Sequence, residues 1–185
     1  MQLVLASKSP RRKELLSFLS QDFIIRTADT DETILPGTSP EDAVKQLAQR
    51  KGLAVERKEG ELILSADTVV ACDGKILGKP KDEEDAFAML SMLSGRSHKV
   101  FTGYCLWDGT TQVVDCAETQ VTFYPLSQEE VWEYIRTGEP MDKAGAYGIQ
   151  GKGSLLVEGI QGDYFNVVGL PVAAILRQLR QHFGW

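Results

Sequence analysis

The sequence predicts an α/β domain built on a mixed, partly antiparallel sheet that is flanked by helices. Two observations lead to this prediction: short apolar strands first alternate with capped helices, and two long strands on either side of an Asp-Gly pair then follow. The 185 residues are a normal length for one compact domain. Because no repeat, low-complexity segment or linker divides the chain, we expect a single domain over residues 1–185.

The first predicted elements are short. Residues 3–6 are typical of a buried strand, and residues 23–25 of a second one. Between them, Ser9-Pro10 predicts an N-cap followed by proline at the first helical position. The helix that follows has an apolar side formed by Leu15, Leu16, Phe18 and Leu19.

The next elements are longer. Ser39-Pro40 repeats the cap-and-proline signal and predicts a helix through about Arg57. Residues 62–72 predict an apolar strand with a polar interruption around Asp67, and Asp73-Gly74 predicts a hairpin turn behind it.

A third helix and the long strands come next. Residues 82–93 predict a helix with four apolar side chains at helical spacing: Ala86, Met89, Leu90 and Leu93. Residues 99–107 and 111–124 predict the two long strands, and Asp108-Gly109 predicts the turn that joins them.

The C-terminal part of the chain predicts two more helices and one strand. Ser127 and Glu130 have the spacing of a capping box at the start of a helix. Residues 155–160 predict a strand after a glycine-rich segment. The last helix has an apolar side made of Val172, Ile175, Leu176 and Leu179.

Composition excludes several classes of protein. Hydrophobic residues at 43% and charged residues at 25% are ordinary globular values, which argues against disordered and fibrous proteins. No stretch approaches the roughly 20 apolar residues of a membrane span, and the first residues lack the features of a secretion signal. We therefore expect a soluble, cytoplasmic protein without a membrane partner. The net charge of −6 disfavours nucleic acid as a partner, although it permits an anionic small substrate.

The cysteines predict neither a disulfide framework nor a zinc site. Cys72, Cys105 and Cys116 are an odd number and lack C-x-x-C spacing. In a hairpin closed at Asp108-Gly109, Cys105 and Cys116 lie too far apart for a bridge. We expect three reduced thiols.

A basic run at the first helix is the first candidate for chemistry. Residues 7–13 read Ser-Lys-Ser-Pro-Arg-Arg-Lys, and cations in the first turn oppose the helix dipole. A bound phosphate would reverse this cost, because free N–H groups, serine hydroxyls and arginines would all face an anion. The alternative is a solvated basic face on an amphipathic helix.

Acidic side chains form the second candidate. Asp67 lies within an apolar run, where a carboxylate is costly to bury unless it is paired or bound to a metal. It could be a Mg²⁺ ligand, a general base for water, or both, or else a structural aspartate that caps a bulge. Asp29, Asp31 and Glu32 lie in a loop that could be merely solvated. Together with Asp67, they offer the two carboxylates that a largely water- and phosphate-coordinated Mg²⁺ needs.

Further candidates could bind a phosphate or a base. Lys51 lies within a predicted helix and Lys79 follows a hairpin, and either is a phosphate ligand or a solvated lysine. The glycine-rich residues 142–151 permit close approach of a ligand, with charge from Lys143 and base-edge hydrogen bonds from Gln150. Asp142 could simply pair with Lys143.

Several familiar sites are absent. The sequence has no G-x-x-x-x-G-K-[ST], no G-x-S-x-G and no G-x-G-x-x-G motif. His98 and His182 are the only histidines, and neither has neighbours that support a Ser–His–Asp site. We expect a solvated or core-edge histidine at each position.

These segments together resemble the Maf family of nucleoside triphosphate pyrophosphatases over nearly the whole chain. The matching blocks are residues 5–12 (LASKSPRR), 65–70 (SADTVV), 78–80 (GKP), 93–98 (LSGRSH), 100–103 (VFTG), 139–151 (EPMDKAGAYGIQG) and 166–171 (NVVGLP). The resemblance implies a fold related to inosine triphosphate pyrophosphatases, in which two lobes of an elongated twisted sheet surround a central cleft. It also implies a divalent metal cation, Mg²⁺ or Mn²⁺, and a homodimer.

The resemblance also implies roles for individual residues. Asp67 would be the catalytic proton acceptor, Glu32 a catalytic metal-site carboxylate beside it, and Lys79 a further catalytic residue at the phosphates. The phosphate pocket would also contain Ser7, Arg12, Lys51 and Lys143.

Three positions indicate the substrate. Arg11, Thr68 and Gln150 match the branch that resembles dTTP/UTP pyrophosphatases rather than the branch that acts on 7-methyl-GTP. The expected activity is hydrolysis of dTTP and UTP, and of modified pyrimidine nucleotides, to the monophosphate and pyrophosphate. The alternatives are a nucleotide-binding regulator of cell division with little catalysis and a nucleic-acid-binding module.

Overall fold

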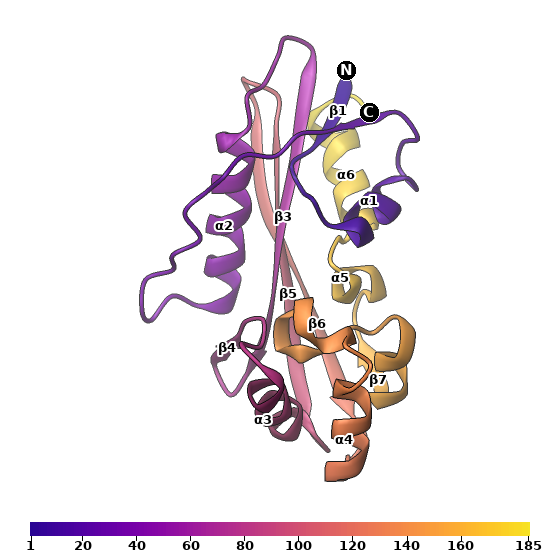
Figure 1. Ribbon diagram of the computed structural model, residues 1–185. Coiled ribbons are helices and arrows are strands. Elements are labelled where there is room, and N and C mark those ends of the chain that lie inside the picture. Colours follow the sequence, from indigo (N-terminus) through magenta and orange to yellow (C-terminus); the bar gives the residue numbers. More distant parts are fainter. The chain divides into compact units, whose positions relative to one another are not determined.

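The computed structural model describes residues 1–185 and has the predicted α/β fold (Figure 1). Two compact units divide the chain. The first contains Met1–Thr68, Thr102–Ala117 and Gly169–Trp185, and the second contains Val69–Phe101 and Glu118–Val168. The predicted single domain with two lobes around a cleft stays a prediction.

Seven strands form one mixed sheet in the order β2-β1-β3-β5-β6-β7, with β4 paired to β3. The strands are β1 (Gln2–Leu5), β2 (Phe23–Ile25), β3 (Glu61–Cys72), β4 (Lys75–Leu77), β5 (Ser97–Trp107), β6 (Gln112–Phe123) and β7 (Val157–Gln161). Strand β1 is parallel to both β2 and β3, whereas β4 and β7 pair antiparallel with β3 and β6. The mixed sheet predicted from the sequence is thereby confirmed.

Six α-helices accompany the sheet. They are α1 (Pro10–Leu16), α2 (Pro40–Ala54), α3 (Glu83–Leu93), α4 (Gln128–Ile135), α5 (Tyr164–Val168) and α6 (Val172–His182). Three short 3₁₀ helices precede β7: η1 (Glu139–Asp142), η2 (Ala144–Ala146) and η3 (Gly151–Leu156).

The predicted helix starts are confirmed. Ser9, Ser39, Asp82 and Ser127 each cap a helix, since the side chain of each accepts a hydrogen bond from a backbone N–H of the first turn. At Ser127 the reciprocal bond from the Glu130 carboxylate completes the predicted capping box. Local sequence signals therefore decide where these helices begin.

Three predicted boundaries were wrong. Helix α1 ends at Leu16, so Phe18 does not join its apolar side and is 62% exposed. Helix α2 ends at Ala54, because Val55 is extended and buried. Residues before Val157 coil into η3, which leaves Leu155 exposed and shifts β7 toward the C-terminus.

In the first unit, helix α2 packs directly on the sheet at two glycines. A Cβ at Gly103 in β5 would lie 2.4 Å from the backbone carbonyl of Val44, and one at Gly52 in α2 would lie 2.7 Å from Oγ of Ser65 in β3. The Ser65 hydroxyl donates to the Ala48 carbonyl at 2.6 Å. Because neither glycine has a side chain, the helix lies close to β3 and β5, which places Lys51 against the strand that carries Asp67.

An ion pair ties the start of β3 to the chain after β2. Arg26 donates to both carboxylate oxygens of Glu61, at 2.6 and 2.8 Å. These hydrogen bonds, with one from the Lys58 amide, lower the pKa of the Glu61 carboxyl to about 2. Because β2 and β3 are both parallel to β1, this pair connects the C-terminal end of β2 with the N-terminal start of β3.

The second unit has a core of helices α3 and α4 against its part of the sheet. His98 lies inside this core and is 2% exposed, so the expectation of a solvated or core-edge residue was wrong there. Its Nε2 lies 2.6 Å from the hydroxyl of Tyr147, and its ring stacks edge-on with Phe123. Burial lowers the pKa of His98 to about 4. His182 is exposed on α6.

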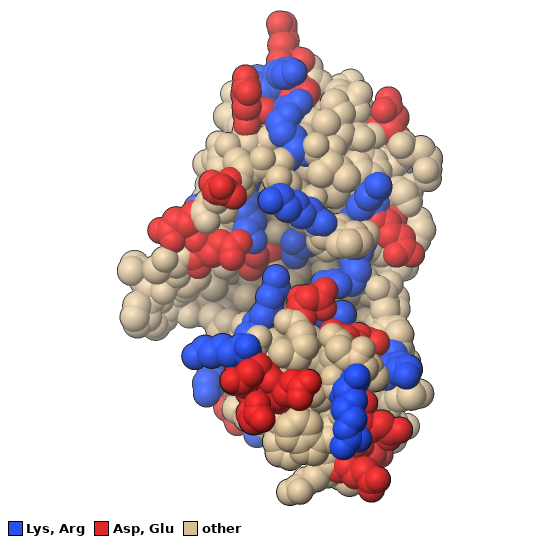
Figure 2. All heavy atoms as spheres, in the orientation of Figure 1, with Lys and Arg blue, Asp and Glu red and all other residues tan.

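The surface charges, the lengths of the helices and the state of the cysteines can be compared with the expectations from composition. Figure 2 shows acidic and basic side chains interspersed on the face that it draws. No helix is both long and apolar enough to cross a membrane. Cys72, Cys105 and Cys116 are free thiols as predicted, and burial raises the pKa of Cys105 to about 11.

Candidate active site

Two carboxylates and one ammonium meet in the first unit. Nζ of Lys51, on α2, lies 2.5 Å from Oδ1 of Asp67 on β3 and 2.8 Å from Oε1 of Glu32. The side chains of Lys51 and Asp67 are only 20% and 15% exposed, whereas that of Glu32 is 63% exposed. The Lys51–Asp67 pair is therefore the inner, less screened contact, and Glu32 joins it from the solvent side.

The loop that carries Glu32 is attached to the helix that carries Lys51. Nη1 of Arg50 donates to the carbonyls of Asp31, at 3.3 Å, and Thr33, at 2.6 Å, the two residues that flank Glu32. The Asp31 carboxylate instead accepts from the Thr33 amide at 2.9 Å, and hydrogen bonds with Thr33 lower its pKa. Of Asp31 and Glu32, the structure thus brings Glu32 to Lys51 and Asp67.

Arg12 lies beside this cluster. Its Nε donates to the Gly169 carbonyl at 2.8 Å, and its Nη2 donates to Oγ1 of Thr68 at 3.0 Å. Thr68 also lies 2.8 Å from the hydroxyl of the fully buried Thr102. Burial lowers the pKa of Arg12, while the negative charge of Asp67 opposes that shift. The guanidinium is thereby oriented by two fixed acceptors next to the acidic pair.

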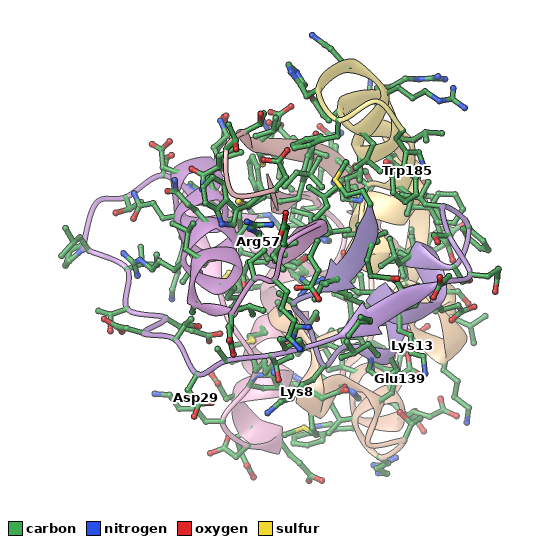
Figure 3. All side chains as sticks on the ribbon, turned by 90° about the horizontal axis from the view of Figure 1, so that it is seen from above. Lys8, Lys13, Asp29, Arg57, Glu139 and Trp185 are labelled. Atoms are coloured by element: carbon green, nitrogen blue, oxygen red, sulfur yellow. The ribbon has the colours of Figure 1, made fainter.

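The other residues of the basic run differ in their exposure to solvent. Lys8 and Lys13 are exposed (Figure 3), as the solvated alternative expects, and Arg11 is half-buried. Ser7 is buried, and its hydroxyl accepts from the Ser9 amide at 3.2 Å. The structure thus brings together Arg12, Thr68, Asp67, Lys51 and Glu32 from four separate parts of the sequence.

The remaining predicted residues belong to the second unit. Lys79 is exposed just after β4, and Gln150 is half-buried at the start of η3. Nζ of Lys143 donates to the Glu139 carbonyl at 2.8 Å and to the Asp142 carboxylate at 2.9 Å. The predicted pairing of Asp142 with Lys143 is confirmed.

Comparison with known proteins identifies the family. The family model described as Maf-like protein matches residues 2–182, which is nearly the whole chain. The chain belongs to the Maf-like protein family. The resemblance found in the sequence motifs is thereby confirmed.

Relatives of this Maf-like chain carry one functional name. A protein of Thermococcus gammatolerans named dTTP/UTP pyrophosphatase is 51% identical over 179 residues, which are 96% of each chain. Proteins with the same name from Symbiobacterium thermophilum and from a Geobacillus species are each 50% identical over 185 residues. These alignments cover this entire chain and 95% and 99% of the two relatives.

The acidic pair of the Maf-like chain suits a hard divalent cation. Asp67 and Glu32 both direct an oxygen to one cationic centre, the Lys51 ammonium. Mg²⁺ typically uses one or two carboxylates and takes its other ligands from water and substrate phosphates. No group of three or more His, Cys, Asp and Glu side chains with metal-binding geometry is present. The donor set therefore fits a metal that is completed by a phosphorylated ligand rather than a cage made of protein alone.

Sequence reasoning missed three contributors to this geometry. Arg50 holds the Glu32 loop, Thr102 contacts Thr68, and the Gly169 carbonyl orients Arg12. Gly169 and Thr102 lie in motif blocks that matched the family without indicating a role for either residue, and Arg50 is one of several basic residues on α2. Of the three, only Gly169 could have been suspected from its residue type, because glycine often marks an unusual backbone conformation. Its φ in the structure is +129°.

Proposed function

We propose that this chain hydrolyses dTTP and UTP to the nucleoside monophosphate and pyrophosphate, with the help of a divalent cation. The names and full-length alignment of the relatives support the reaction class. The observation that carries the proposal is the convergence of Glu32 and Asp67 on Lys51, with Arg12 beside them. Such an arrangement combines a carboxylate for proton transfer with cations for phosphate binding.

Asp67 is the proton acceptor in this proposal. Its carboxylate takes a proton from a water molecule whose oxygen attacks the α-phosphorus, and the bond from that phosphorus to the bridging oxygen breaks. The electron pair leaves with pyrophosphate, and the other product is the monophosphate. Lys51 orients the Asp67 carboxylate for this step through a charge-assisted hydrogen bond, because its ammonium lies 2.5 Å away.

Glu32 and Asp67 would hold the metal ion, Mg²⁺ or Mn²⁺. Once bound there, it would supply positive charge to the phosphate oxygens and lower the barrier to attack. The contribution of the protein is to keep the two carboxylates converging, through Lys51 and through the hydrogen bonds from Arg50 to the Glu32 loop.

The other proposed residues bind and select the nucleotide. Arg12 presents a guanidinium whose position is fixed by Thr68 and Gly169, so it binds phosphate with little loss of side-chain entropy. Roles for the remaining side chains rest on the family motifs: Ser7, Lys79 and Lys143 at the phosphates, and Arg11, Thr68 and Gln150 in substrate selection. The same resemblance leads us to propose a homodimer that acts in the cytoplasm.

A substrate panel tests the activity. Purified protein is incubated with dTTP, UTP, dCTP, dATP and GTP, and with modified pyrimidine triphosphates, in Mg²⁺, in Mn²⁺ or in EDTA. We expect pyrophosphate and monophosphate from dTTP and UTP, and no turnover in EDTA. Release of inorganic phosphate from the γ position would assign a different reaction. Nucleotide binding without any turnover would favour the regulator of cell division.

Asp67→Asn tests the role of the proton acceptor. General-base catalysis contributes about 10²–10⁴-fold, so turnover should fall by that factor while the Kd for a non-hydrolysable dTTP analogue changes little. Asp22→Asn, at an exposed position of the same unit, is the matched control and should turn over dTTP like the wild type. Equal turnover of the Asp67→Asn variant and the wild type would reject the assignment.

A further inference from the structure

The carboxylate of Glu139 organises a glycine-rich segment of the second unit. Oε1 of Glu139 accepts from the Tyr134 hydroxyl at 2.9 Å and from the Gly153 amide at 3.0 Å. Its Oε2 accepts from the Lys152 amide at 3.2 Å. The position of this residue in η1 can be followed in Figure 3. One carboxylate thus accepts from three donors, and it replaces the hydrogen bonds that these donors make with water in the unfolded chain.

Tyr134 extends this network to the other end of the segment. Its hydroxyl donates to Glu139 and accepts from the Gly148 amide at 3.2 Å. The side chain is buried, and burial raises the pKa of Tyr134, so the phenol keeps the proton that it donates. Glu139 and Tyr134 therefore fix the backbone at Gly148, Lys152 and Gly153, on both sides of Gln150.

The same residues set the position of Lys143. Its ammonium donates to the Glu139 carbonyl, and its stem lies so close to Gly148 that a Cβ there would be 2.6 Å from Cε of the lysine. The segment also folds tightly on itself, since a Cβ at Gly153 would lie 1.8 Å from the Gly148 carbonyl oxygen. A side chain at Gly153 would therefore move the backbone, and one at Gly148 would displace the Lys143 side chain.

Backbone strain shows that this conformation is imposed by its surroundings. Gly145 and Ala146 both have positive φ, +71° and +61°, and Ala146 is fully buried. A non-glycine residue in this left-handed region is strained, and its conformation persists only where neighbouring contacts determine it. Anchors lie on both sides: the Gly145 amide donates to the Gly78 carbonyl at 3.1 Å, and Tyr147 contacts His98 at 2.6 Å.

We infer that Glu139 is a positioning residue for substrate selection, acting with Tyr134 on the backbone that carries Gln150 and on the Lys143 side chain. The inference rests on the proposed function, in which Gln150 helps to select the base and Lys143 binds phosphate. Glu139 itself does not touch the nucleotide. Its carboxylate determines where the amide of Gln150 is presented, and its main-chain carbonyl holds the ammonium of Lys143.

Glu139→Gln is the first test, because it keeps the side-chain shape and replaces one acceptor oxygen by a donor amide that faces N–H or O–H groups. Tyr134→Phe removes only the hydroxyl. For both variants we expect KM for dTTP and UTP to rise about 10-fold, the effect of one buried hydrogen bond. The preference for dTTP over dATP, as a ratio of kcat/KM, should fall by a similar factor, with little change in kcat for dTTP.

Amide hydrogen exchange supplies a readout independent of turnover. Peptides that cover residues 148–153 should exchange faster in both variants than in the wild type, while peptides from α3 stay protected. Glu133→Gln is the matched control, since Glu133 is exposed on the same helix as Tyr134, and it should change neither quantity. The double variant should lose little more than either single variant, because both act on one network.

The outcomes separate this inference from the proposed function. An inactive wild-type protein would reject the proposed function, and the inference with it. An active wild type whose Glu139→Gln variant loses turnover of all nucleotides by one common factor, with unchanged nucleotide preference, would overturn the inference alone. Unchanged exchange at residues 148–153 would overturn it as well.

Discussion

Nζ of Lys51 lies 2.5 Å from Oδ1 of Asp67, and both side chains are mostly shielded from solvent. In the proposed reaction Lys51 would have two effects: it orients the Asp67 carboxylate through a charge-assisted hydrogen bond, and it adds positive charge where phosphates bind. The relationship depends on how closely helix α2 approaches strand β3, and that approach depends on glycines. A change in the charge of Lys51 and a change in the packing of α2 on β3 should therefore both affect activity.

Lys51→Met should lower kcat/KM for dTTP by about 100-fold or more, because losing a cation of the phosphate site and the partner of Asp67 affects the transition state directly. The methionine keeps most of the apolar stem, so folding should be little affected. Lys45→Met is the control, since that lysine forms its ion pair with Glu41 of the same helix and not with Asp67. Similar kinetics for the two variants would argue against a role for Lys51.

Arg12→Lys should lower kcat/KM by about 10–100-fold, although the charge is kept. A lysine cannot donate at once to the Gly169 carbonyl and to Thr68 with the geometry of the guanidinium. Steady-state kinetics with dTTP measure the effect, and the loss should appear mainly in KM if the residue binds phosphate. Arg180→Lys, on the exposed side of α6, should be neutral. Wild-type kinetics in Arg12→Lys would show that charge alone suffices there.

Gly103→Ala should destabilise the protein by about 1–3 kcal/mol, because the new methyl group overlaps the backbone of Val44. Urea denaturation measures the change in the free energy of unfolding. The same variant should lower turnover, since α2 must shift and α2 carries Lys51. Gly159→Ala is the matched control, because a Cβ there meets nothing within 4 Å. A stable and fully active Gly103→Ala variant would refute this account of the helix position.

The buried His98 should make stability depend on pH. Its pKa is about 4 in the folded protein because of burial, against 6.5 ordinarily, so the unfolded chain binds the proton more readily. The free energy of unfolding should therefore fall between pH 6.5 and 4 by about 3 kcal/mol from this residue, and this contribution should level off below pH 4. Stability above pH 6.5 is unaffected by this group.

His98→Gln isolates that contribution. Glutamine can still hydrogen-bond the Tyr147 hydroxyl but does not titrate, so the unfolding free energy of the variant should depend less on pH between 6.5 and 4 than that of the wild type. Urea denaturation of both proteins at pH 7, 6, 5 and 4.5 measures the difference. Parallel pH curves for the two proteins would show that His98 is not held neutral by the fold.

The local features of this protein could be predicted from its sequence. Ser9, Ser39, Asp82 and Ser127 mark the helix starts because a cap depends on residues within one turn. The strands around Asp67 and the turn at Asp73-Gly74 follow from apolar runs and from the positive φ that the turn needs. The motif blocks also indicate the family, since they are contiguous in the sequence. Helix ends were less predictable, as Phe18 shows, because tertiary packing decides where a helix stops.

Which charged side chains contact one another depends on the packing of distant segments. Asp31 and Glu32 are equivalent acids in the sequence, yet the hydrogen bonds of Arg50 to the loop direct Glu32 to Lys51. Lys8, Arg12 and Lys13 form one basic run, yet of these three only Arg12 reaches acceptors on β3 and before α6. The periodicity of apolar residues predicts which face of a helix or strand is buried. It does not predict which distant segments come into contact when helices and loops pack against the sheet. For that reason the partners of Asp67 follow from the packing of α2 and not from its own neighbours in the chain.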